Sequence, residues 1–564
     1  MFRFLQKKNY KLICLLVYFA VLLGCTFFNF NDAFLSDDYD MIYRIGEYNN
    51  NPLKYLITNR DGFAGQGGLY RPTFVFSFWL NYVTWNNAWN YHALNFILHL
   101  FSSYFIFLVM QLLLQKYAKP KKSRLIAFLC ALLFLISPMH SESITWISGR
   151  TDLLCFFFMI FCWLLLLKFE NSKKIMLYVF SLLLFFISLL AKEMSIVFPA
   201  ILSVSVLLFY FARNNYKQKL VYILKYHSAF YLVIVVYLFV RAKVLGTLFG
   251  GYGQLSYFEN LKYTIKALID NFSYFLFHLI GPVREQISLF NKEHYFIFAF
   301  FLLILVSALG FVLRKQLKFY IFCLIGFLLF LLPVINLPVQ TYDHSGQRIT
   351  YFSSLFFYLI IALLFYKLIA KHKKVGIIAF IVFFIINLVV FINLNLNWQK
   401  ASQLSEKIIN DFAKVVDLSQ KNKLVVLALP DNVNGAYIFR NCFFEAVKIK
   451  YNKTDQDLQM LVLPYKFVLD NKTWDQNLIA WEQTKHNFMI GTKILKKEKL
   501  IMAGENYANE NYSSKLLNFD STFNVGDKIW IEWKDAFLSA SKENPPDFIY
   551  YNNGTLEQFE YDFN

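Results

Sequence analysis

Long apolar runs separated by short polar loops fill the first 400 or so residues of the chain. A helix that crosses a membrane needs about 20 consecutive apolar residues. The runs predict about eleven such helices and therefore a polytopic α-helical membrane protein. The predicted spans fall near 12–30, 93–114, 124–139, 152–168, 175–191, 195–212, 226–245, 295–313, 319–337, 351–370 and 375–395.

Two further apolar segments do not fit this series. Residues 260–281 carry Lys262, Lys266 and Asp270, which favours a re-entrant or surface-lying segment over a span. Residues 73–85 are aromatic but too short to span comfortably, which predicts a helix lying in the membrane interface. The residues on its predicted apolar face are Phe74, Phe78, Trp79 and Tyr82.

The charge distribution sets the predicted orientation. The formal charge is +19, and the first 396 residues hold 36 Lys and Arg against 15 Asp and Glu. Residues 397–564 are nearly balanced, with 20 basic and 22 acidic side chains. Positively charged short loops stay on the cytoplasmic side, so membrane topology accounts for the excess without a nucleic-acid partner.

This orientation places the loop after the first span and the C-terminal region on the same outer face. We therefore expect a membrane module at 1–396, with a first outer loop at 31–91, and an extracytoplasmic soluble domain at 397–564. Within that domain the pattern predicts strands near 423–429, 458–463 and 528–533, a turn at 430–432 and a helix over 436–448. Such an order is typical of a small α/β or α+β domain.

The first outer loop begins with two adjacent carboxylates, Asp37 and Asp38. They follow the first apolar run and so lie just outside the hydrocarbon, where ionisation costs little. Neighbouring carboxylates repel, so one proton is held more tightly unless a cation or metal lies nearby. The pair suits a general base, and a hydrated loop start is the plain alternative.

The other outer segments carry acids, bases and guanidinium groups. In chain order they are Tyr70-Arg71-Pro72, His92-x-x-Asn95-x-x-x-His99, His140-x-Glu142-x-x-x-Trp146-x-x-Gly149-Arg150-x-Asp152, Lys192-Glu193, Arg348-x-x-Tyr351 and Trp398. The spacing places His92, Asn95 and His99 on one helical face, which points to a cavity or to hydrogen bonds between helices. Polar groups gathered at one membrane face favour catalysis at that surface.

Together with the Asp pair, these motifs resemble the GT-C superfamily of polytopic glycosyltransferases. The nearest branch is the transmembrane O-mannosyltransferases that carry tetratricopeptide repeats, and the likeness covers about residues 30–400. The resemblance implies a cavity open to the lumen or periplasm, a polyprenyl-phosphate-linked sugar donor, commonly mannose, and inversion of the anomeric centre. Residues 397–564 depart from the pattern because they show no 34-residue repeat.

The roles follow from the chemistry of glycosyl transfer, in which an anion leaves on one side and an acceptor hydroxyl attacks from the other. We assign the base to Asp37 or Asp38, between which the sequence does not decide. The leaving phosphate needs cations, and the Arg fork matches its oxygens bidentately. The candidates, in order, are Arg348, Arg71, Lys192 and Arg150. The residues expected to orient donor or acceptor are His140, Glu142, His92, Asn95, Trp146 and Tyr351.

No cofactor is required by this scheme, although Asp38, His140 and Glu142 could instead ligate a divalent metal ion. The expected partners are the lipid-linked donor, membrane lipids and an acceptor, which is either protein Ser or Thr, or a glycolipid or surface polysaccharide. A non-enzymatic transporter or flippase of lipid-linked sugars is the competing class, but it would show internal repeats and charges at the midplane. The lack of tetratricopeptide repeats favours a bacterial inner-membrane enzyme whose site and C-terminal domain face the periplasm.

Overall fold

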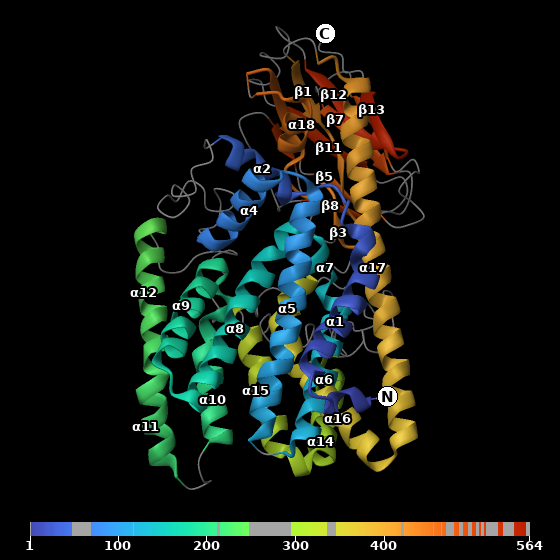
Figure 1. The fold of residues 1–564 in the computed structure, drawn as a ribbon. Coiled ribbons are helices and arrows are strands. Elements are labelled where there is room, and N and C mark those ends of the chain that lie inside the picture. The colour runs from blue at the N-terminus through green and yellow to red at the C-terminus, as the bar shows by residue number, and fades with distance from the viewer. Residues whose placement is uncertain are drawn as a thin grey trace. The chain divides into compact units, whose positions relative to one another are not determined.

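Two compact units make up the chain, and both draw on separate stretches of sequence (Figure 1). The first unit comprises Met1–Phe30 and Tyr48–Asn395, and the second comprises Asn31–Glu47 and Leu396–Asn564. The computed structural model describes residues 2–47, 69–116, 118–210, 215–246, 295–334, 346–418, 422–454, 456–463, 465–469, 479–483, 489–494, 499–502, 507–508, 512–514, 528–533 and 546–559. The segment 260–281, for which a re-entrant course is predicted, lies outside these residues.

The first unit is helical throughout its described residues. Its helices are α1 (Tyr10–Thr26), α4 (Pro72–Thr84), α5 (Ala88–Gln115), α6 (Pro120–Leu135), α7 (Ser141–Thr145), α8 (Arg150–Ser172), α9 (Ile175–Ala191), α10 (Phe198–Phe209), α11 (Tyr216–Tyr226), α12 (Ser228–Leu245), α14 (Tyr295–Val312), α15 (Leu317–Leu331), α16 (Tyr351–Lys371) and the start of α17 (Lys373–Val415). Short 3₁₀ turns join several of them, namely η4 (Pro138–His140), η5 (Ile147–Gly149), η6 (Glu193–Val197) and η11 (Gln347–Thr350).

Seven helices among the described residues are long and apolar enough to cross a membrane, or eight if a bent pair counts as one span. This finding supports a polytopic helical membrane protein, but the predicted count of about eleven is wrong for helices of full spanning length. Residues 175–191 and 193–209 form shorter helices, and α6 is bent by 52° against the segment Pro138–Thr145. Apolar run length says little about where a helix stops. Here the extended backbone of Lys192 ends α9.

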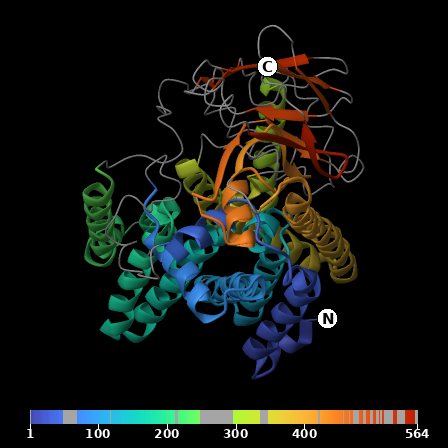
Figure 2. The ribbon, with the colours of Figure 1, turned by 90° about the horizontal axis from the view of Figure 1, so that it is seen from above.

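The core of this unit is built around α5, α6 and α8. The helix α8 packs against α5 and α9, and α6 packs against α5 and α16. Every residue from Ile126 to Ile136 is buried, as expected for a helix that is apolar on all sides. The pair α11–α12 lies at the rim beyond α9 in both views (Figures 1 and 2), and it leaves large apolar side chains such as Leu232 exposed.

The predicted short aromatic helix is confirmed as α4, which Pro72 starts in the favoured first-turn position. Phe74 and Phe78 are fully buried, as the predicted face requires. Its exposed apolar side chains are Phe76, Leu80 and Val83, so its apolar surface is broader than the sequence pattern indicates.

The second unit contains the helices α2 (Asp37–Glu47) and α18 (Phe443–Tyr451), the last part of α17 and three sheets. The first sheet has the order β13-β12-β1-β4, with strands Thr555–Phe559, Asp547–Asn552, Asn422–Val426 and Leu458–Val462. Its central strand β1 runs parallel to β4 and β12, with Val425 opposite Leu461 and Phe548. The second sheet has the order β3-β2-β5-β8, with strands Ala436–Tyr437, Leu429–Val433, Tyr465–Leu469 and Lys499–Met502.

The third sheet is antiparallel, with the order β6-β7-β11-β10-β9. Its strands are Ile479–Gln483, Met489–Ile494, Lys528–Trp533, Tyr512–Ser514 and Tyr507–Ala508. The three predicted strands are confirmed as β1, β4 and β11. The predicted turn at 430–432 is wrong, because these residues lie within β2. The hairpin turns instead at Asn434 and Gly435, which both have positive φ, the sequence pair that such turns favour.

The structure of the second unit differs from two further expectations. The predicted helix over 436–448 begins only at Phe443, because Ala436–Tyr437 pairs with β2 as β3. Residues 31–47, which the sequence pattern groups with the membrane module, pack with the C-terminal region instead. The Asp pair at the start of α2 therefore belongs to the second unit.

Candidate functional site

The segment from Ser137 to Asp152, predicted to be an outer loop, is buried at every residue. It consists of η4, α7 and η5, folded tightly before α8 begins. Gly149 allows this course, because a Cβ there would lie 2.7 Å from the backbone oxygen of Glu142. The polar side chains of this segment are therefore held inside the first unit.

Asn95 and Arg150 hold the segment in place. The Asn95 amide donates to the carbonyl oxygens of Ile144 (3.2 Å) and Trp146 (3.3 Å) and accepts from Arg150 Nε at 2.7 Å. Arg150 is 0% exposed. It also donates to Asn81 Oδ1 at 2.7 Å and to a backbone oxygen of α5 at 2.8 Å. These contacts hold the loop in place, and the predicted phosphate-binding role of Arg150 stays a prediction.

Asn395, near the end of the last apolar run, is a second anchor that sequence reasoning missed. Its side-chain oxygen accepts from Ser141 Oγ at 2.6 Å and from Thr145 Oγ1 at 3.0 Å. Its amide donates to the carbonyl of Cys25 at 3.3 Å, so one residue ties the loop to two helices. The available signal was a polar residue inside an apolar run, which is costly unless it has partners.

The predicted histidines lie beneath this segment among aromatic rings. His99 shares a hydrogen bond of 2.7 Å with the Tyr351 hydroxyl, and its other nitrogen lies 3.0 Å from the carbonyl oxygen of Leu135. His140 lies 2.8 Å from Ser354 Oγ, and its ring centroid is 4.4 Å from that of Tyr351. All are buried. His92 is 6% exposed, and the predicted orienting roles of His140, His92 and Tyr351 stay predictions.

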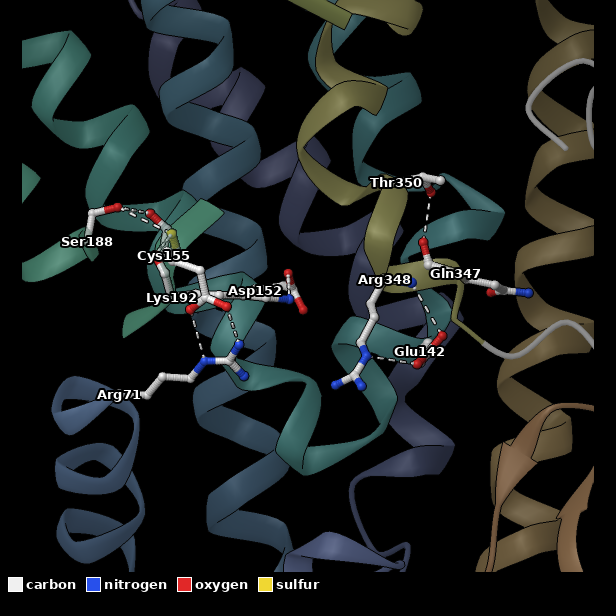
Figure 3. A network of polar contacts seen from close by, with 10 residues as sticks. Arg71, Glu142, Asp152, Cys155, Ser188, Lys192, Gln347, Arg348 and Thr350 are labelled. Carbon is white, nitrogen blue, oxygen red and sulfur yellow. Dashed lines mark hydrogen bonds and ion pairs between the residues drawn. The ribbon is translucent and has the colours of Figure 1, made fainter. Parts of the chain in front are cut away.

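Three ion pairs form the charged part of the site (Figure 3). Arg71 Nη2 lies 2.8 Å from Glu193 Oε1, and Lys192 Nζ lies 2.6 Å from Asp152 Oδ1. Arg348 Nε lies 3.2 Å from Glu142 Oε1, and its backbone NH donates to the other carboxylate oxygen at 3.3 Å. Three of the four predicted phosphate-binding cations are thus each held by a carboxylate. The acids Asp152 and Glu193 were recognised as motif residues but were not assigned roles.

The three cations differ in how much of the side chain is exposed to solvent. The side chains of Arg71 and Lys192 are each 4% exposed, whereas that of Arg348 is 22% exposed. The Arg348 guanidinium also lies over the Trp146 ring, 4.7 Å from its centroid, a geometry that favours a cation. Arg348 is therefore the most accessible cation of the site, and Trp146 and Glu142 orient it.

The buried pair of Lys192 and Asp152 is tied to the neighbouring helices. Cys155 donates its thiol to the Lys192 carbonyl at 3.2 Å, and Ser188 donates to the Cys155 carbonyl at 2.7 Å. Asp152 Oδ2 is buried and has no hydrogen-bond partner within the described part of the chain. A buried carboxylate oxygen in this state is a ready acceptor for a polar group that enters the site.

The ion pair with Arg71 keeps the Glu193 carboxyl ionised. Burial by itself would raise the pKa of the Glu193 carboxyl, but the Arg71 guanidinium lowers it to about 2. Glu193 therefore stays ionised at physiological pH and keeps Arg71 in place.

The structure distinguishes the two candidate bases of the second unit. Asp38 is 1% exposed, and its carboxylate accepts from the backbone NH of Leu35 at 3.0 Å. Asp37 is partly exposed, and its carboxylate accepts from Asn441 Nδ2 at 2.9 Å. Asp37 is thus the carboxylate that a substrate reaches more readily.

A metal was the alternative for Asp38, His140 and Glu142. Across the described ranges, no group of three or more His, Cys, Asp or Glu residues is arranged to hold a metal ion. His140 bonds Ser354, and Glu142 pairs with Arg348. The observed contacts of these two residues are therefore with other protein groups.

Comparisons with known proteins add to this picture. No family model matches the chain. The chain is similar to "Protein O-mannosyl-transferase TMTC1" of Mus musculus (36% identical over 131 residues) and of Homo sapiens (35% identical over 131 residues). The match covers 22% of this chain and 12% and 13% of those proteins. "Protein O-mannosyl-transferase Tmtc1" of Drosophila melanogaster is 32% identical over 149 residues, which are 24% of this chain and 16% of that protein.

The chain thus matches less than a fifth of the length of each of these relatives. These relatives are nevertheless named as protein O-mannosyltransferases, which confirms the resemblance to transmembrane O-mannosyltransferases that the motifs indicate.

Proposed function

We propose that this chain is an integral-membrane inverting glycosyltransferase. It moves a sugar, mannose in the first instance, from a polyprenyl-phosphate donor to a protein Ser or Thr hydroxyl on the outer face of the membrane. The helical membrane architecture and the names of the similar proteins support this proposal. The bacterial inner membrane remains the location predicted from the sequence, whereas the similar proteins named above are animal proteins.

The observation that carries the proposal is the arrangement of Arg348 on Trp146 and Glu142. A leaving polyprenyl phosphate develops negative charge beside the membrane, and a guanidinium matches its oxygens with two parallel donors. Glu142 and Trp146 hold that guanidinium in one orientation before the donor binds, so little reorganisation is needed during the reaction. The paired carboxylates of Glu193 and Asp152 hold Arg71 and Lys192 at fixed positions in the same unit.

The proposed reaction is a single displacement. The bond between the sugar C1 and the phosphate oxygen breaks, and polyprenyl phosphate leaves with the electron pair. The acceptor oxygen forms a new bond to C1 from the opposite face, and its proton passes to the carboxylate of Asp37. A positioned base of this kind typically gives about 10²- to 10⁴-fold in rate. Asp37 is preferred to Asp38 because it is the more exposed carboxylate.

The proposal is tested with the purified full chain in lipid. The donor is polyprenyl-phosphate mannose carrying a labelled sugar, and the acceptor is a Ser/Thr peptide. Release and transfer of the label are followed for the native chain and for Arg348→Ala, Arg348→Lys and Asp37→Asn. Arg314→Ala is the matched control, because Arg314 is an exposed arginine of the same unit that lies over Phe311.

We expect both Arg348 variants and Asp37→Asn to lose most of the transfer, and we expect the control to keep it. The product should have the anomeric configuration opposite to that of the donor. Full transfer by Arg348→Ala would show that Arg348 does not bind the leaving phosphate. If the native chain does not turn over the donor but moves the lipid-linked sugar across the membrane of vesicles, the protein is a transporter and not a transferase.

A further inference from the structure

The segment between β3 and α18 of the second unit contacts the start of α2, which carries Asp37. Ser36 donates its backbone NH to the Ile438 carbonyl at 2.9 Å. Asn441 donates its backbone NH to Ser36 Oγ at 3.3 Å and its side-chain amide to Asp37 Oδ1 at 2.9 Å. Three hydrogen bonds therefore join the residues around the Asp pair to this segment.

The backbone at both sides of this contact is unusual. Ser36 has φ of +48° and Cys442 has φ of +68°, in the left-handed region that residues with a Cβ rarely adopt. Such conformations persist only where the surrounding structure enforces them, and they cluster at functional sites. One lies directly before Asp37 and the other directly after Asn441, so both strained residues flank the amide–carboxylate contact.

We infer that Asn441 is a positioning residue for the proposed catalytic base. Its amide donor holds the Asp37 carboxylate in one orientation, from which the carboxylate accepts the proton of the acceptor hydroxyl. The C-terminal region thereby completes the base instead of serving only as a separate domain. This inference rests on the proposed function, and it adds a residue that no motif of the membrane part contains.

The charged and titratable groups around this contact come from two helices. On α2 they are Asp38, Asp40 and Arg44, and at the N-cap and on α18 they are Cys442, Glu445 and Lys448. Arg44 pairs with Asp40 at 2.6 Å, and Lys448 Nζ lies 3.8 Å from the centroid of the Tyr43 ring. Burial raises the pKa of the Cys442 thiol, so this neighbour stays neutral at physiological pH.

A purely structural role for Asn441 makes different predictions. The Asn441 side chain is exposed, and its backbone bond to Ser36 remains in an alanine variant. A substitution at this position therefore leaves most of the contact between the segment and α2 intact. Loss of the amide acts on the orientation of the Asp37 carboxylate and should appear in kcat.

The experiment uses the full chain in lipid with labelled polyprenyl-phosphate mannose and a Ser/Thr peptide. The variants are Asn441→Ala, Asn441→Asp and Asp37→Asn. The control is Lys450→Ala, an exposed residue of α18. The readouts are kcat, KM for the donor and the midpoint of thermal unfolding.

We expect Asn441→Ala to lower kcat roughly 10- to 100-fold with little change in KM, because a misplaced reacting group loses rate of this order. The midpoint of thermal unfolding should change little, because the backbone bond of residue 441 to Ser36 remains. Asn441→Asp should lower kcat at least as far, because it replaces the donor beside Asp37 with a like charge. Lys450→Ala should match the native chain.

Two results would overturn the inference and are distinguishable from failure of the proposed function. If Asp37→Asn is inactive but Asn441→Ala keeps the native kcat, Asn441 has no positioning role. If Asn441→Ala lowers the unfolding midpoint and leaves kcat of the folded protein unchanged, the contact is structural. Full activity of Asp37→Asn would remove the proposed base and the inference with it.

Discussion

Replacing Arg150 with lysine tests whether this guanidinium holds the loop or binds substrate. The native side chain is 0% exposed and makes three short hydrogen bonds, to Asn95 Oδ1, to Asn81 Oδ1 and to the Tyr91 carbonyl. Each arises from a different nitrogen of the fork. The single ammonium group of lysine keeps the charge but cannot reach all three acceptors.

The expected loss follows from those contacts. A hydrogen bond to a charged group contributes about 1.5–3 kcal/mol, so two lost bonds lower the free energy of unfolding by roughly 3–6 kcal/mol. The two acceptors left behind are buried, and burial without a partner is the costly state of a polar group. We therefore expect Arg150→Lys to be severely destabilised.

The assay is thermal unfolding of the purified chain in detergent, followed by size-exclusion chromatography, with Arg314→Lys as the exposed-arginine control. The KM for the lipid-linked donor is measured on the folded fraction at low temperature. We expect a clear drop in the unfolding midpoint and an unchanged KM. An unchanged midpoint together with a KM raised tenfold or more would refute the reasoning and return Arg150 to the phosphate site.

Three further predictions concern the same unit. Gly149→Ala places a methyl group 2.7 Å from a backbone oxygen, so we expect about 1–3 kcal/mol of destabilisation, and a native unfolding midpoint would contradict this. Asn395→Ala leaves two buried hydroxyls without their acceptor and should cost about 1–3 kcal/mol in chemical unfolding, whereas Asn393→Ala, exposed on the same helix, should cost little. Arg71 depresses the Glu193 pKa from its ordinary 4.5 to about 2, so the pair's stabilisation is fully present above pH 4.5 and is lost as the pH falls through 2. Glu193→Gln should therefore lower the unfolding midpoint equally at pH 6 and pH 8 and converge on the native chain only in acid; a difference that changes between pH 6 and pH 8 would contradict this.

Much of the architecture could be predicted from the sequence because it follows from local properties. Apolar run length predicts helices, and alternating or continuous β-branched runs predict strands such as β1 and β11. Neither property shows where a helix breaks. Lys192 has an extended backbone and pairs with Asp152 of α8, and the chain bends between α6 and Pro138, so the predicted count of full-length spans is too high.

The order of the motifs, the charge asymmetry and the apolar runs by themselves determined the membrane class, the family resemblance and the residues worth testing. Only the tertiary structure decided what those residues contact. It placed Arg150 among buried acceptors, paired Arg348 with Glu142, and joined Asp37 to Asn441 from the far end of the sequence. The physical reason is that a side chain's role depends on its partners and its burial. Both are set by segments far apart in the sequence, from 55 residues for Arg150 and Asn95 to 404 for Asp37 and Asn441.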